Sequence, residues 1–90
     1  MERKIKRVEY NRKFLKRLSK LPDKIINEAQ EKEVIFRANA FDQRLGTHKL
    51  HGKDKDCWAF WINHSYRVKF IFLSDGEVLF LDVGTHDIYE

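Results

Sequence analysis

The sequence predicts an α+β fold with a short N-terminal strand, two helices and then an antiparallel three-stranded meander that forms a curved sheet. Two observations predict this fold. From residue 11 to residue 38, apolar side chains recur every three or four positions, as they do in amphipathic helices. From residue 58 to residue 84, two turn signals separate three runs rich in apolar and β-branched side chains, as in an antiparallel meander.

Residues 5–10 are rich in side chains that favour β-structure, and they predict the first strand. Asn11 is a candidate N-cap of the first helix, because its side chain can accept a backbone N–H. The apolar positions of this helix are expected to be buried; they are Phe14, Leu15, Leu18 and Leu21. Its basic positions are expected to face outward; they are Arg12, Lys13, Lys16, Arg17 and Lys20.

The second helix is predicted to begin at Pro22, which suits a first helical turn, and Asp23 places a negative charge near the positive end of the helix dipole. Apolar residues from Ile25 to Phe36 extend the helix to about residue 38. Residues 42–56 are polar and contain two glycines, so we expect a loop there, with room for a short strand at its start.

Asp75-Gly76 predicts a two-residue type I′ turn between the last two strands. The register that follows pairs Phe72 with Leu79, Phe70 with Leu81, Val68 with Val83, Lys69 with Asp82 and Arg67 with Gly84. Residues 63–65 predict a three-residue loop, which pairs Ile62 with Tyr66, Phe60 with Val68 and Trp58 with Phe70. A slip by one residue would place aromatic side chains opposite Arg67 and Lys69.

The predicted sheet has one fully apolar face for the two helices. At the far end of its other face, four apolar residues need cover from elsewhere in the chain or from a partner. They are Ile71, Leu73, Val78 and Phe80.

The composition excludes several classes of protein. Of the 90 residues, 42% are hydrophobic, which excludes a highly charged disordered chain, and the single cysteine excludes an internal disulfide framework. No stretch approaches the roughly 20 apolar residues of a membrane span, so we expect a cytoplasmic protein with no membrane partner and a single domain over residues 1–90. Nine Lys and Arg against two Glu in residues 1–20 suggest a polyanion or an acidic protein as partner.

Arg67 and Trp61 are expected on the polar face of the sheet, together with His86 if the alternation continues past Gly84. A guanidinium can hold a phosphate, an imidazole can move a proton near neutral pH, and an indole can stack on an unpaired base. Together they suit RNA cleavage, in which a ribose 2′-OH attacks its own 3′-phosphate. The alternative is a structural cluster of cross-strand Arg, Lys and Asp with a histidine at the strand end.

The polar loop carries further histidines and lysines. His48 and His51 lie among Lys49, Lys53 and Lys55, although a loop histidine is commonly just solvated. His48, His51 and Cys57 have no standard zinc spacing and no fourth ligand, so we expect no metal site.

Four sequence motifs follow one another along the chain, and they are informative when they are taken together in this order. They are Tyr10-x3-Phe14-x3-Leu18-x2-Leu21-Pro22, Thr47-His48-Lys49-Leu50-His51-Gly52, Tyr66-Arg67-Val68 and Val83-Gly84-Thr85-His86-Asp87-Ile88-Tyr89. Over nearly all of its length the chain resembles the RelE/ParE superfamily of toxins from type II toxin–antitoxin systems. The most similar branch is that of the RelE/YafQ-like mRNA interferases.

This resemblance implies a metal-independent endoribonuclease without a cofactor, which cleaves mRNA in the A site of the ribosome. It also implies a cognate antitoxin that neutralises the toxin in a hetero-oligomer. By position, His86 matches the catalytic residue near the C-terminus, Arg67 the phosphate-binding arginine and His48 a histidine of the YafQ-like branch. Residues expected to bind substrate are Lys49, Lys53, Lys55, Trp61, Lys69 and Tyr89. Where YafQ-like sequences have a further His and Asp, this chain has Trp61 and Ser65.

Two other interpretations remain open at this point. A ParE-like toxin would share the fold but bind DNA gyrase and cut no RNA, and a noncatalytic module would bind RNA only. His86 together with Arg67 and the basic loop favours the nuclease. An acidic, amphipathic antitoxin segment is expected to cover either the basic face of the first helix or the apolar strip at the far end of the sheet.

Overall fold

The computed structural model describes residues 2–52 and 56–89, which form an α+β fold with two helices and one sheet. The first half of the chain contains β1 (Arg7–Tyr10), α1 (Arg12–Ser19), α2 (Asp23–Ala38), the 3-10 turn η1 (Gln43–Leu45) and β2 (His48–Lys49). The second half contains β3 (Trp58–Trp61), β4 (Arg67–Phe72), β5 (Glu77–Gly84) and the 3-10 turn η3 (His86–Tyr89). None of the described helices is long and apolar enough to cross a membrane.

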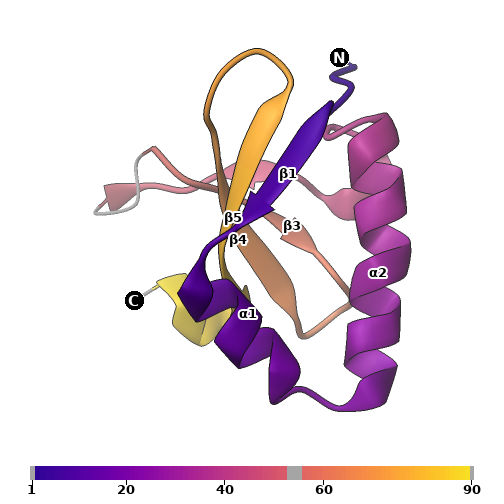
Figure 1. The fold of residues 1–90 in the computed structure, drawn as a ribbon, viewed down its shortest axis with the longest axis vertical. Coiled ribbons are helices and arrows are strands. Elements are labelled where there is room, and N and C mark those ends of the chain that lie inside the picture. The colour runs from indigo at the N-terminus through magenta and orange to yellow at the C-terminus, as the bar shows by residue number, and fades with distance from the viewer. Residues whose placement is uncertain (1, 53–55, 90) are drawn as a thin grey trace.

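The sheet is larger than the predicted three-stranded meander. It has five strands in the order β1-β5-β4-β3-β2, and β1 runs parallel to β5 whereas all other neighbours are antiparallel. Figure 1 shows β1 crossing the molecule beside β5, with α2 along one side of the sheet. The meander β3-β4-β5 is therefore correct but incomplete. Local patterns do not identify the partner of a short strand such as β1, because a parallel pair needs a long crossover connection.

The core is a cluster of aromatic rings between α2 and the sheet. Phe36 of α2 is fully buried, and its ring centroid lies 4.8 Å from that of Phe60, 5.0 Å from that of Phe70 and 5.5 Å from that of Phe80. Phe14 of α1 joins this cluster through Phe80, at 5.3 Å. One aromatic residue from each of β3, β4 and β5 thus anchors both helices to the same face of the sheet.

The predicted cap of α1 is confirmed, but two of its side chains lie differently than expected. The Asn11 side-chain oxygen accepts a hydrogen bond from the Phe14 backbone N–H at 2.8 Å. Leu15 is 51% exposed, because this short helix meets the sheet mainly through Phe14 and Leu18. Arg17, which was expected to face outward, folds back onto β5 and binds the Asp82 carboxylate.

The register between β4 and β5 agrees with the prediction in one half and differs in the other. Arg67, Val68 and Lys69 pair with Gly84, Val83 and Asp82 as predicted, and the pairs across the β3–β4 hairpin are confirmed. Nearer the turn, Phe70 pairs with Phe80 and Phe72 with Val78, instead of with Leu81 and Leu79.

Two irregularities of one residue each explain this difference. The β4–β5 loop has three residues, since Leu73 N–H donates to the Glu77 carbonyl at 2.9 Å and Gly76 has a φ of 79°. A positive φ at the last loop position is typical of three-residue hairpin loops, whereas the predicted type I′ turn also needs one at Asp75. A bulge at Leu81 then restores the register, because β4 advances from Lys69 to Phe70 while β5 advances from Asp82 to Phe80.

The apolar strip predicted on the polar face is consequently wrong in two of its four members. Val78 and Phe80 are fully buried in the core. The polar face instead carries Leu79 and Leu81 beside Ile71, all half-buried, and Leu73 is 46% exposed near the hairpin tip.

Gly76→Ala should destabilise the fold by about 1–2 kcal/mol, because an L side chain is strained at a positive φ. Its Cβ would also lie 3.0 Å from Cγ of Lys6. Gly76→Asn should cost less, since Asn tolerates this region better. Urea unfolding of the three proteins measures both effects, and equal stability of the parent and the Ala variant would contradict the three-residue loop.

Candidate functional site

The polar face of the sheet carries four of the predicted site residues in two cross-strand rows. Trp61, Arg67 and Gly84 form one row, and the Arg67 guanidinium carbon lies 5.9 Å from the Trp61 ring centroid. Residues directly opposite each other in antiparallel strands project to the same face. Arg67 and Trp61 therefore share one face, as predicted.

The second row consists of His48, Ala59, Lys69 and Asp82. Ala59 is fully buried and separates the strand of His48 from that of Lys69. His48 Nδ1 lies 2.9 Å from the Gly46 carbonyl oxygen, which fixes the ring. His48 thus lies on the same face as Arg67, two strands away from it.

His86 and Arg67 line one open pocket of about 510 Å³, which we call the Arg67–His86 pocket. The other lining residues are His64, Ser65 and Thr85. Strand β5 ends at Gly84, so His86 reaches this pocket from η3 and not by continued alternation along the strand. Two imidazoles and a guanidinium beside one open pocket can bind a phosphate and transfer protons near it.

A second pocket of about 360 Å³ adjoins the first and shares His64 and Arg67 with it. We call it the Lys32–Trp61 pocket. Its remaining lining residues are Lys32, Arg44, Trp61 and Asn63. The described lining thus contains three permanent cations and no carboxylate.

The position of His86 depends on an ion-pair network that links α1, β5 and η3. Arg17 Nη1 donates to both Asp82 carboxylate oxygens at 3.2 Å, and its Nη2 donates to Asp87 at 2.9 Å. The hydrogen bond from Arg17 lowers the pKa of Asp87 below its ordinary value. Gly84 leaves the space for this contact, since a Cβ there would lie 2.7 Å from Arg17 Nη2. In Figure 1 the C-terminal turn, in yellow, accordingly lies beside α1.

His64 is a pocket residue that no sequence motif singles out, because turn geometry alone explains a histidine at a hairpin tip. The tip is held firmly. Asn63 Oδ1 accepts from the backbone N–H groups of Ser65 and Tyr66 at 2.8 and 2.9 Å, while Asn63 Nδ2 donates to Glu28 of α2 at 2.7 Å. The Asn63 turn is a sequence signal for a fixed tip, but its contact with α2 is visible only in three dimensions.

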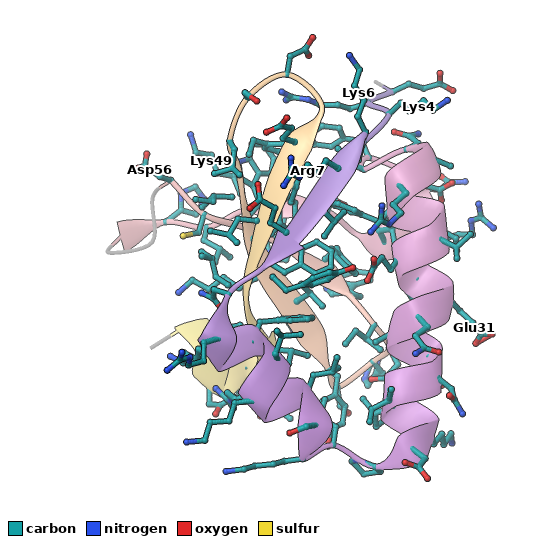
Figure 2. The ribbon with its side chains drawn as sticks, in the orientation of Figure 1. Lys4, Lys6, Arg7, Glu31, Lys49 and Asp56 are labelled. Carbon is teal, nitrogen blue, oxygen red and sulfur yellow. The ribbon has the colours of Figure 1, made fainter. Side chains whose placement is uncertain are left out.

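The remaining predicted substrate-binding residues are dispersed. Lys49 pairs with Trp58 and is exposed on the opposite face of the sheet from Arg67. Figure 2 shows Lys49 and Asp56 on the side of the molecule away from α2, from which Glu31 projects outward. Lys53 and Lys55 lie outside the described residues, and the Tyr89 backbone ends η3. Among the residues that the structure describes, no three His, Cys, Asp or Glu side chains are grouped as a metal site would require.

The fold of the chain resembles that of toxins whose structures have been solved. No family model matches the chain, and no curated protein matches it in sequence. Solved structures of toxins do match it over nearly its whole length.

The toxin–antitoxin complex RelBE2 from Mycobacterium tuberculosis matches with a TM-score of 0.76 at 17% identity, over 94% of this chain and 93% of the matched chain. The E. coli DinJ-YafQ toxin–antitoxin complex matches with a TM-score of 0.69 at 20% identity, over 98% and 97%. A YoeB/ParE toxin from Agrobacterium tumefaciens matches with a TM-score of 0.74 at 10% identity, over 89% and 98%. The chain therefore has the fold of the RelE, YafQ and ParE toxins, and the resemblance stated from its motifs is confirmed at the level of the fold.

Asp87→Asn should make the protein less sensitive to acid. Because Arg17 lowers the pKa of Asp87 from 3.8, this carboxylate contributes stability above about pH 4. That contribution is lost as the pH falls through the lowered value. Melting temperatures measured from pH 7 to pH 2 should thus decline less in the variant than in the parent. Asp75→Asn in the exposed β4–β5 loop is the matched control, and identical acid sensitivity of all three proteins would contradict the Arg17–Asp87 contact.

Proposed function

We propose that this protein is the toxin of a type II toxin–antitoxin system and that it acts in the cytoplasm as a ribosome-dependent mRNA endoribonuclease. The single observation that carries the proposal is the meeting of Arg67 and His86 at one open pocket, on a fold shared with RelE and YafQ toxins. The two residues lie on different elements, 19 positions apart, and both match motif positions of the interferases.

The proposed reaction needs only groups that the chain itself supplies. A base takes the proton of the ribose 2′-OH as its oxygen attacks the adjacent phosphorus. The bond from phosphorus to the 5′-oxygen breaks, and an acid protonates that oxygen, which leaves a 2′,3′-cyclic phosphate and a 5′-OH end. Arg67 stabilises the charge that builds up on the phosphate oxygens. His86 is the main proton-transfer group, with His48 secondary.

Trp61 and Lys69 contact the substrate on the same face. The mRNA or ribosomal RNA around this face is held by four further residues: Lys49, Lys53, Lys55 and Tyr89. In the ribosomal A site an mRNA codon is single-stranded, so that its bases can stack on an aromatic ring.

The proposed partner is an acidic, amphipathic segment of the cognate antitoxin. Arg12, Lys13 and Lys16 form an exposed basic flank of α1. Next to it, a groove of about 340 Å³ between α1 and α2 exposes Leu15 and Val34, the latter by 71%. An amphipathic helix could bury its apolar side in this groove and pair its acidic side with the basic flank. The α1 flank and groove thus replace the apolar strip of the sheet as the favoured surface.

Arg67→Ala should leave the protein folded and lower the cleavage rate about 10²–10³-fold, as expected for the loss of one charge-stabilising donor. Toxicity in a growth assay should disappear at equal expression. Arg7→Ala, an exposed arginine of β1 bound only to Glu9 among the described residues, is the matched control and should remain toxic. Full toxicity of the Arg67 variant would refute its assignment.

His86→Gln should abolish ribosome-dependent cleavage while antitoxin binding is kept, since a positioned imidazole contributes about 10²–10⁴ in rate. His48→Gln should weaken cleavage less, because His48 lies two strands away from Arg67. His51→Gln, in the exposed loop, serves as the control. Cleavage at the parental rate by the His86 variant, or loss of cleavage in the His48 variant alone, would reverse this order.

A further inference from the structure

The Lys32–Trp61 pocket lies next to the proposed cleavage site, and two of its cations have no role in the reaction described above. It contains Lys32 and Arg44, neither of which belongs to any motif of the sequence. Because it shares Arg67 and His64 with the Arg67–His86 pocket, a ligand that occupies one pocket can continue directly into the other.

Trp61 presents its indole to this pocket in a fixed position. Trp61 is the last residue of β3 and is 43% exposed. Gly46 supports the ring from behind: it has a φ of 57°, and a Cβ there would lie 2.6 Å from Cδ2 of the indole. The neighbouring Leu45 is fully buried and anchors η1 in the core. One side of the indole is thus held by backbone, which fixes the position of the ring beside the Arg67 guanidinium.

The two additional cations are also held in place. Lys32 Nζ donates one hydrogen bond to the Ile62 carbonyl at 2.8 Å, and an ammonium group has three donors. Asp42 accepts from Nε and Nη2 of Arg44, both at 2.9 Å, which fixes the plane of the guanidinium. The same contact lowers the pKa of Asp42 to about 2 and keeps this carboxylate ionised at neutral pH. Side chains that are ordered before binding lose less entropy when a ligand arrives.

We propose that the Lys32–Trp61 pocket binds the nucleotide adjacent to the scissile phosphate of a single-stranded RNA, with its base stacked on Trp61 and its phosphate bound by Lys32 and Arg44. This inference rests on the proposed function and adds a second subsite to it. Cations beside an exposed aromatic ring are the combination by which proteins bind single strands irrespective of sequence. The shared Arg67 makes the two subsites continuous along one strand.

An acidic protein segment is the competing ligand for three cations. It would use Lys32 and Arg44 but would have no need of a rigid, exposed indole, and the groove between α1 and α2 already offers a more apolar surface for a protein helix. The indole therefore favours RNA.

Fluorescence of Trp61 tests the proposal in the full-length protein. Only two tryptophans are present, so a Trp58→Phe background leaves Trp61 as the sole reporter. The probe is a hexanucleotide of 2′-O-methyl RNA, which lacks the attacking hydroxyl and is not cleaved. Binding should quench Trp61, and Trp61→Ala should weaken binding about 5- to 150-fold when polarisation of a labelled probe is measured.

The salt dependence of binding tests the two cations. Lys32→Gln and Arg44→Gln should each reduce the slope of log Kobs against log salt concentration by about 0.7, the value for one lost phosphate contact on a single strand. Lys24→Gln, at an exposed position near the start of the same helix, is the matched control and should keep the parental slope.

Three results would overturn the subsite. One is RNA binding that leaves Trp61 fluorescence unchanged, with the same salt slope in the Lys32 and Lys24 variants. Another is no binding of the hexanucleotide at low salt, and the third is quenching by an acidic peptide in place of RNA. Because the probe cannot be cut, these results are distinct from failure of the proposed nuclease, which a separate cleavage assay on translating ribosomes would reveal.

Discussion

The arrangement of the site depends on one buried charge, Asp82, and on the two cations of α1 that compensate it, Arg17 and Lys13. The Asp82 side chain is 6% exposed, and an ionised carboxylate at such a position is costly unless it is paired. Arg17 reaches it from α1 and at the same time binds Asp87 of η3. The one side chain therefore joins the first helix, the last strand and the C-terminal turn. The buried Ile88 side chain and a hydrogen bond from Lys69 Nζ to the Ile88 carbonyl at 3.4 Å also hold the His86 segment against the sheet.

The bulge at Leu81 is the backbone feature that makes this network possible. It lets Val78 and Phe80 enter the core near the hairpin while Asp82, two residues beyond Phe80, still lies opposite Lys69 on the polar face. Without the extra residue, either the aromatic core or the polar row would be out of register. The same sequence thus satisfies two demands: apolar packing against Phe36 at one end of β5, and a charged, ligand-facing surface at the other.

The sequence was informative where local physical chemistry decides the structure and silent where distant contacts do. Periodicity and turn residues are enough to predict four features. They are the Asn11 cap, both helices, the β3–β4 register and the shared face of Trp61 and Arg67. Contacts between residues far apart in the sequence determine three other features. They are the parallel pairing of β1 with β5, the inward turn of Arg17 and the hydrogen bond that joins the His64 hairpin to α2. The Asp75-Gly76 dipeptide also suits a three-residue loop, so it could not fix the register alone. The position of His64 at a hairpin tip likewise gives no sequence signal for the pocket that it lines.

Mapping of mRNA ends is the most direct test of the proposed cleavage of mRNA on the ribosome. Purified protein is added to a translating extract, and the 5′ ends of a defined mRNA are sequenced with and without an inhibitor of initiation. A ribosome-dependent interferase should produce new 5′-OH ends at codon spacing within the translated region, and these ends should disappear when translation is blocked. Intact mRNA together with inhibition of DNA supercoiling by gyrase would contradict it and would indicate a ParE-like toxin instead.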